Sequence, residues 1–249
     1  MVGKLHTFRL MLLIMIIPIF FSCVTTQQIA ASYNSRGITY GQKGDYDQAI
    51  SEFNRAIEID PGFAEAYGNR GLSYEKKGQY EEAISDYTRA LELDPKLGPV
   101  YNNRASAYSH RGQYDEAISD MNKAIEIHPW FAPFYSNRGE AYRKKSDYDR
   151  AMSDFNRAIE IDRRVARAYV GRGEVHNDKG GYDQAISDFN KALEINPNFA
   201  RAFYNRGRCY YFKKEYDKSW KDIKRAQDLG YKIPPEFLEE LRKASGRQN

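Results

Sequence analysis

The sequence predicts an all-α protein built as a solenoid of stacked helical hairpins, and three observations lead to this fold class. A nineteen-residue phrase, FNRAIEIDPGFAEAYGNRG, begins at Phe53 and returns almost unchanged at Phe189. The copies lie 136 residues apart, four times 34, and Tyr87, Met121 and Phe155 head the copies between them. Within each copy, apolar and small residues recur at spacings of three and four, as on one face of a helix. Such a period is typical of repeat proteins, in which stacked units replace a single globular core.

The composition suits a folded, well-solvated protein. Of the 249 residues, 41% are hydrophobic and 29% are charged, which argues against disorder. The formal net charge is only +4, and Lys4 and Arg9 contribute to it from the first 22 residues, which contain no Asp or Glu. We therefore expect no nucleic-acid partner.

The sequence contains no pattern typical of a catalytic, metal or cofactor site. The histidines are scattered and lack ligand spacing, and there is no glycine-rich phosphate loop or nucleophile elbow. Two cysteines are too few for a disulfide framework. We expect no catalytic residue, metal, cofactor or small-molecule substrate, and an enzyme is the unfavoured alternative class.

Residues 1–22 have the pattern of a signal peptide. Lys4 and Arg9 precede a twelve-residue apolar run from Leu10 to Phe21, whereas a membrane-spanning helix needs about 20 residues. The ending FFSC resembles a bacterial lipoprotein box, although that family prefers Leu where Phe20 stands. The resemblance implies cleavage before Cys23 and fatty acylation of this cysteine; an ordinary cleaved signal or an uncleaved short anchor are the alternatives.

The resemblance to a lipoprotein signal also implies that the protein is located in a bacterial cell envelope. Val24 stands where an Asp would resemble an inner-membrane retention signal, so an outer-membrane position facing the periplasm is favoured in a Gram-negative bacterium. Residues 23–29 form a short tether before the first repeat, at most about 25 Å long when extended. Partners are therefore expected close to the membrane.

Residues 30–233 form six repeats, and we number the 34 places of each repeat from its first residue. The repeats are 30–63, 64–97, 98–131, 132–165, 166–199 and 200–233. Places 4, 8 and 11 share one face of a first helix and carry an aromatic, a small residue and usually Tyr, as in Tyr67, Gly71 and Tyr74. Places 20, 24 and 27 share one face of a second helix, as in Ala83, Tyr87 and Ala90. The two faces should pack together, with the small residue at place 8 admitting the second helix and the ring at place 4 filling the gap beside it.

Glycine and proline mark the ends of the two helices of a repeat. Glycines suited to a left-handed cap follow the first helix, and prolines stop the second. The glycines are Gly44, Gly78, Gly112 and Gly180, and the prolines are Pro61, Pro95, Pro129 and Pro197.

This pattern of Gly, Tyr, Ala, aromatic, Ala and Pro closely resembles the tetratricopeptide repeat. The resemblance implies a right-handed α-solenoid of six helix-turn-helix repeats. The chain departs from this pattern at Ala105, which replaces glycine, and at Arg163, which replaces proline. The sixth repeat is degenerate and carries Ser219, Ile223 and Tyr231. Residues 234–249 then begin with prolines and carry Phe237, Leu238, Leu241 and Ala244 on one stripe, which predicts a capping helix.

A row of ion pairs is expected along the stack. Place 7 is arginine in all six repeats and place 23 is Glu or Asp, and packed places of the antiparallel hairpin sum to about 31. Arg104, for example, should reach Asp120 or the preceding Asp86; solvated charges without a fixed partner are the alternative. His176, at a framework tyrosine place, and Cys209, at a small-residue place, are interpreted as packing residues.

By resemblance to the family, places 2, 5, 9, 12 and 13 line a concave groove that binds an extended peptide or a helix of a partner protein. The chain retains groove asparagines but lacks the lysine of the carboxylate clamp of chaperone adaptors. The candidate groove residues are Asn69, Asn103, Asn137, Arg167, Arg201, Tyr204, Asn205, Arg208, Tyr211 and Phe212.

The carboxy-terminal end of the groove is expected to bind the partner, because aromatics and arginines dominate many interfaces. The alternative is that Tyr204, Tyr211 and Phe212 pack under the capping helix. Glu140, Glu174 and Asp178 lie one or two repeats earlier on the same wall, so a ligand with an acidic or apolar end beside a basic segment would suit the order of charges.

The sequence thus predicts a membrane-anchored protein-interaction scaffold. Its architecture is similar to that of pilotins, which assemble type IV pilus secretins, and less closely to adaptors that recruit a peptidase or a peptidoglycan hydrolase. These functions are analogies, because fold does not fix function.

Overall fold

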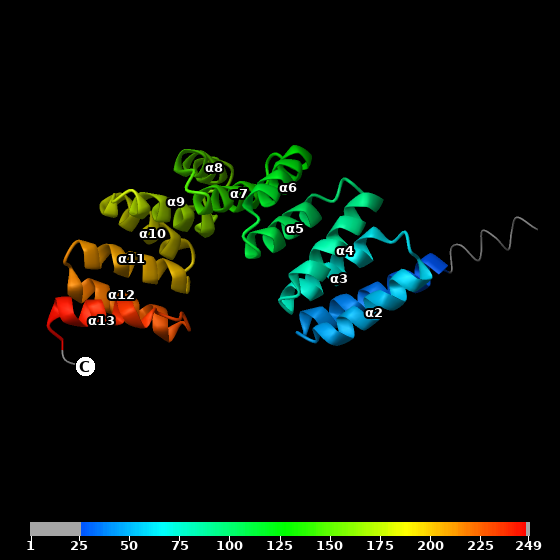
Figure 1. Ribbon diagram of the computed structural model, residues 1–249, viewed down its shortest axis with the longest axis horizontal. Helices are drawn as coiled ribbons and strands as arrows, with labels where there is room; N and C mark the ends of the chain where they lie inside the picture. Colours follow the sequence, from blue (N-terminus) through cyan, green and yellow to red (C-terminus); the bar gives the residue numbers. More distant parts are fainter. Residues whose placement is uncertain (1–25, 248–249) are drawn as a thin grey trace, which may run out of the picture. The chain divides into compact units, whose positions relative to one another are not determined.

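A computed structural model describes residues 26–247, and every secondary-structure element in this range is a helix (Figure 1). The signal peptide predicted over 1–22 and the acylation site Cys23 lie outside the described residues. The chain divides into two compact units, Met1–Gly112 and Gln113–Asn249. The boundary falls inside the third repeat, between its two helices.

The first unit contains a helix over 26–42, followed by α2 (Tyr46–Ile59), α3 (Ala64–Lys76), α4 (Tyr80–Leu93) and α5 (Gly98–His110). The helix over 26–42 includes residues 26–29, which the sequence assigned to the tether. The predicted tether therefore overlaps this helix.

The second unit continues the same alternation of first and second helices. It contains α6 (Tyr114–Ile127), α7 (Ala132–Lys144), α8 (Tyr148–Ile161), α9 (Ala166–Asp178), α10 (Tyr182–Ile195), α11 (Ala200–Phe212), α12 (Tyr216–Asp228) and α13 (Pro235–Ser245). The helix boundaries recur every 34 residues. The all-α solenoid of helical hairpins predicted from the sequence is confirmed.

The predicted glycine caps are observed, and the exceptions keep the same geometry. Gly78 and Gly180 have φ near +77°, in the left-handed region that favours glycine. Ser146 and Lys214 take φ of 60° at the equivalent places of repeats four and six. Similarly, α8 ends at Ile161 although Arg163 replaces the proline. A glycine or proline that marks a helix end can therefore be replaced without moving that end.

Within a repeat, the small residue at place 8 packs against the ring at place 24. A Cβ atom at Gly71 would lie 2.8 Å from the Tyr87 ring, so only glycine admits this close approach. The ring at place 4 packs within its own hairpin and also against the preceding one: Tyr169 shares a core cluster with Phe189 of its own repeat and with Ile159 of the preceding repeat.

The arginine row at place 7 is confirmed within both units. Five arginines contact the acid at place 23 of their own repeat over 2.6–2.7 Å at the closest atoms: Arg36–Glu52, Arg70–Asp86, Arg138–Asp154, Arg172–Asp188 and Arg206–Asp222. Arg104 donates to Thr88 Oγ1 at 2.9 Å, whereas Asp120 belongs to the second unit.

The structure adds two links between repeats that the sequence analysis missed. In four repeats the arginine at place 7 also donates from Nη1 to an asparagine at place 25 of the preceding repeat, as from Arg70 to Asn54 at 2.6 Å. In addition, a cation at place 14 pairs with an acid at place 18 of the preceding repeat, as Lys179 does with Asp149. This second row is exposed, so each of its pairs contributes little to stability.

The capping helix α13 covers the last hairpin. Phe237 and Leu241 are buried in a cluster with Ile223 and Ala226 of α12, and Trp220 Nε1 donates to Ser245 Oγ at 3.0 Å. Ala244, which the sequence placed on the apolar stripe, is exposed.

The packing interpretation holds for Cys209 and only partly for His176. Cys209 is fully buried, and burial raises the pKa of its thiol to about 12. The ring of His176 is half-buried, with Nε2 3.8 Å from Asp188 Oδ2.

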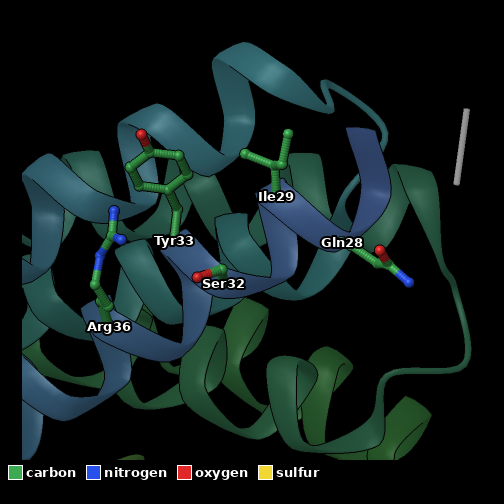
Figure 2. A pocket seen from close by; sticks show the side chains of 5 residues that line it. All are labelled: Gln28, Ile29, Ser32, Tyr33 and Arg36. Carbon is green, nitrogen blue, oxygen red and sulfur yellow. The ribbon is translucent and has the colours of Figure 1, made fainter. Parts of the chain in front are cut away.

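In the first unit, no hairpin of the described residues precedes the helix over 26–42. Gln28, Ile29, Ser32, Tyr33 and Arg36 line a shallow hollow of about 330 Å³ (Figure 2). These residues lie on the side of the helix where later repeats receive a preceding hairpin.

Candidate functional site

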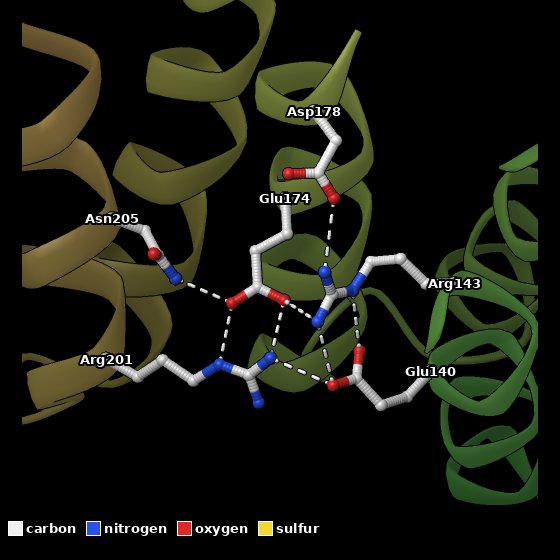
Figure 3. Close-up of polar contacts among 6 residues, drawn as sticks. All are labelled: Glu140, Arg143, Glu174, Asp178, Arg201 and Asn205. Carbon is white, nitrogen blue, oxygen red and sulfur yellow. Dashed lines mark hydrogen bonds and ion pairs between the residues drawn. The ribbon is translucent and has the colours of Figure 1, made fainter. Parts of the chain in front are cut away.

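Three successive first helices of the second unit, α7, α9 and α11, bring six polar residues of the groove-lining surface together (Figure 3). We call them the groove cluster. Its members are Glu140, Arg143, Glu174, Asp178, Arg201 and Asn205. Five of them occupy places 2, 9, 12 and 13, and Asn205 occupies place 6.

Glu174 lies at the centre of the groove cluster. Its carboxylate accepts hydrogen bonds from Arg201 Nε at 2.6 Å, Arg201 Nη2 at 2.5 Å and Asn205 Nδ2 at 2.6 Å. Arg143 Nη2 lies 3.2 Å from the same carboxylate. Glu174 therefore joins α7 and α11 through α9.

Glu140 and Asp178 complete the arrangement. Glu140 accepts hydrogen bonds from Arg143 Nε at 3.0 Å and from Arg201 Nη2 at 3.0 Å. Asp178 accepts from Arg143 Nη1 at 3.2 Å. Each guanidinium is thus shared between acids on different helices, which fixes its orientation and the relative positions of the three helices.

Burial and pairing act in opposite directions on the two glutamates. Burial raises the pKa of Glu174 above its ordinary value, despite the charges of Arg201 and Arg143. At Glu140 burial also opposes ionisation, but the hydrogen bond from Arg143 and the charge of Arg201 outweigh it, so the pKa is lowered. The pKa of Arg201 is raised because Glu174 and Glu140 outweigh the effect of burial.

The groove cluster leaves part of Arg201 accessible. Its side chain is 38% exposed, and its bonds to the cluster are made by Nε and Nη2. Figure 3 shows the other terminal nitrogen directed away from the drawn carboxylates. The half-buried Arg208 and the exposed Arg167 belong to the same set of groove-lining places. This surface can hold carboxylate groups of a ligand through fixed cations.

The aromatic residues predicted at the carboxy-terminal end are mostly engaged within the chain. Tyr204 is only 9% exposed and stacks on Tyr231 at 4.8 Å between ring centroids. Tyr211 packs edge-on against Phe237 of α13 at 5.4 Å. The alternative, packing under the capping helix, therefore describes both rings. Phe212 remains exposed and stacks on Tyr182.

Two of the predicted asparagines of the earlier repeats, Asn69 and Asn103, form hydrogen bonds with other asparagines. Asn69 Nδ2 donates to Asn34 Oδ1 at 3.0 Å, which links the first two repeats. Asn102 donates to Asn103 Oδ1 at 3.2 Å, and Asn137 is half-buried in the second unit.

The sequence singled out every member of the groove cluster except Arg143. The available signal was its i,i+3 spacing from Glu140 on a helix that was already assigned. Among the described residues, no group of His, Cys, Asp or Glu is arranged to hold a metal ion. Nor does the described part of the chain contain a helix of sufficient length and apolarity to cross a membrane.

Comparisons with known families agree with the repeat pattern. Models described as tetratricopeptide repeat match residues 64–97 and 96–164, and a model described as TPR repeat matches 37–78 and 173–213. Together these matches cover more than half of the chain. Among curated protein sequences, none matches it.

Solved structures with the same architecture include two with moderate sequence similarity. A crystal structure of MamA protein is 27% identical over 70% of this chain and 95% of its own, with a TM-score of 0.59. YrrB, described as a TPR protein with an unusual peptide-binding site, is 26% identical over 78% of this chain and 98% of its own, with a TM-score of 0.54. Pseudomonas aeruginosa pilF is 19% identical over 88% of this chain and 99% of its own, with a TM-score of 0.73, and shows the fold alone.

Proposed function

Because this chain belongs to the tetratricopeptide repeat family, we propose that it is a protein-binding scaffold whose second unit binds an acidic segment of a partner protein. The observation that carries the proposal is the groove cluster, which holds Arg201 in a fixed orientation with one terminal nitrogen accessible. Fixed cations cost little ordering when they bind a carboxylate. The proposed activity is binding, without a catalytic step.

The charges of the groove-lining places favour an acidic partner. The acids Glu140, Glu174 and Asp178 are already engaged by Arg143 and Arg201. Arg167 and Arg208, at places 2 and 9, stand outside the groove cluster and add positive charge to the same surface. The similarity to YrrB supports a peptide as the form of the ligand, because that protein is described as having a peptide-binding site.

We further propose that the scaffold is lipid-anchored through Cys23 and acts near a bacterial membrane, as a pilotin-like assembly factor of an envelope complex. The support is the lipoprotein-like ending FFSC, which lies only a few residues before the helix over 26–42. The alternative role is that of an adaptor for a periplasmic peptidase or peptidoglycan hydrolase, on the same anchored scaffold.

Affinity capture from membrane extracts, followed by titration of the captured partner, tests the groove. The full chain is compared with an Arg167→Glu, Arg208→Glu variant and with a Lys221→Glu control, an exposed position of α12. The groove variant should lose the partner, and the control should retain it. A partner that binds all three forms equally would exclude this groove, provided that circular dichroism shows equal helicity.

A further inference from the structure

The side of the first helix that carries Ile29, Tyr33 and Arg36 is equivalent, in every later repeat, to the side that packs against the preceding hairpin. We call the surface formed by Ile29, Tyr33 and Arg36 the end face. Tyr33 and Arg36 are at places 4 and 7, and Ile29 corresponds to the apolar residue that precedes each later repeat. In those repeats the same places pack against the second helix of the preceding hairpin. Ile29 is 49% exposed.

The interior repeats show which polar group satisfies the arginine on such a face. Arg138, Arg172 and Arg206 each donate from Nη1 to an asparagine of the preceding repeat, over 2.6–2.8 Å. Arg70 does the same, and the side chains of these four arginines are 18–25% exposed. The Arg36 side chain is 49% exposed, donates from Nε to Glu52 and lies over the Tyr33 ring. Arg36 therefore has the acid of its row, while none of the described residues supplies the asparagine of a preceding repeat.

The interior repeats also show which apolar group covers the ring at place 4. Tyr169 and Phe203 belong to one cluster with Ile159 and Leu193, which stand at place 28 of the preceding repeats. Place 28 lies three residues after the asparagine at place 25, so both project from one side of the covering helix. An asparagine followed three residues later by Ile or Leu is therefore the pattern that complements this type of face.

We propose that the end face binds an amphipathic helix of a partner protein, which carries an amide side chain and, three residues later, an aliphatic side chain. Such a helix would occupy the position that the second helix of a hairpin takes in the interior repeats. The amide would accept from Arg36, and the aliphatic side chain would cover Tyr33 and Ile29. The interface continues the stacking that already joins the repeats, and it involves none of the groove residues.

A second copy of this chain fits the end face poorly. The second helix at the carboxy-terminal end, α12, carries Lys224 and Gln227 at places 25 and 28 and is already covered by α13. Head-to-tail stacking would therefore meet neither the required residues nor an open surface. Contact between two end faces would bring together like charges, because Arg36 and Arg55 both lie beside the Tyr33 ring.

A synthetic peptide provides the probe. It carries residues 46–59, the sequence of α2, which covers the equivalent face of α3. A side-chain lactam bridge keeps it helical, and Phe53→Gln removes the apolar group of its other side. Fluorescence anisotropy measures its binding to the full chain in detergent. The matched control peptide carries Asn54→Ala and Ile57→Ser in addition.

The probe peptide should bind the unaltered chain saturably. The control peptide should bind this chain at least about tenfold more weakly, and the probe peptide should bind the Arg36→Gln chain more weakly to the same extent, since a hydrogen bond to a charged group contributes enough for such a change. A Tyr33→Ala variant should weaken binding similarly, whereas the groove variant Arg208→Gln should bind as the unaltered chain does. If the Arg36→Gln and Tyr33→Ala chains bind the peptide as tightly as the unaltered chain does, the proposal is overturned. Dimers of the chain alone in sedimentation, abolished by Tyr33→Ala, would assign the face to a second copy. Binding that requires removal of residues 1–25 would assign it to the chain's own leader.

Discussion

The buried row of arginine–acid pairs at places 7 and 23 should contribute far more to stability than the exposed row at places 14 and 18. Helix α8 carries an acid of each row, so the same change, Asp to Asn, can be made in both. Asp154 and Asp149 both lie on α8 and both accept from a cation of another helix. The Asp154 side chain is 7% exposed, whereas that of Asp149 is 94% exposed. Replacing either by Asn keeps the shape of the side chain and removes its charge.

The Asp154→Asn change should lower the free energy of unfolding by about 2–3 kcal/mol. Removing one member of a fully buried pair costs about 3–5 kcal/mol, and Arg138 is partly exposed, which reduces the penalty. Of its two charge-assisted bonds, 2.8 Å from Nε and 2.7 Å from Nη2, Arg138 would keep at most one, to the amide oxygen and without the charge, beside its bond to Asn122. The Asp149→Asn change should cost less than about 1 kcal/mol, including the favourable position of Asp149 in the first turn of α8.

Urea unfolding followed by circular dichroism measures both changes. Because repeat proteins can unfold in segments, hydrogen exchange of α7 and α8 should accompany it. A combined Arg138→Met, Asp154→Leu variant should recover most of the lost stability, since two apolar side chains leave no uncompensated charge. If Asp154→Asn and Asp149→Asn shift the unfolding midpoint equally, the distinction between the two rows is refuted.

Three further changes test the carboxy-terminal end, the buried thiol and the membrane anchor. Tyr204→Ala should lower the free energy of unfolding by about 3 kcal/mol and accelerate hydrogen exchange in α13, because the ring packs against Phe237; unchanged stability with lost partner binding would contradict this burial. Cys209 should resist iodoacetamide in the native protein at pH 8 and react in urea, because a thiol of pKa about 12 is ionised in only about one molecule in 10⁴. Rapid native alkylation would refute its burial. Cys23→Ala should abolish fatty-acid labelling and release the protein from membranes; labelled protein that stays in the membrane fraction would exclude this site.

Most of the fold could be predicted because each structural requirement recurs at a fixed place. The 34-residue period gives the helices, and the arginine row follows from the antiparallel pairing of places 7 and 23. The packing of Gly71 against Tyr87 follows from the same pairing, which brings places 8 and 24 together. Places within one hairpin can be paired from the sequence alone, because a short turn fixes the register.

Contacts between repeats were harder to predict, because they depend on how far each hairpin is displaced along its neighbour. The bond from Arg70 to Asn54 and the pair between Lys179 and Asp149 both cross from one repeat to the next. The role of Tyr204 depended on a further fact, whether the capping helix lies over its ring. An aromatic residue on a repeat surface has the same sequence signature in a binding site and under a cap.

Place 9 shows how one framework can carry different binding surfaces. In the first unit it holds the exposed Ile38 and Leu72 and then Ser106, whereas in the second unit it holds Glu140, Glu174 and Arg208. Place 9 lies outside the interior of each hairpin, which is filled from places 8, 20, 24 and 27. Variation at place 9 changes the surface from aliphatic to charged while the backbone stays the same. A partner that contacts both units would therefore need an apolar segment for the first and an acidic segment for the second, and separate loss of affinity in Leu72→Asp and Arg208→Glu variants would distinguish the two contributions.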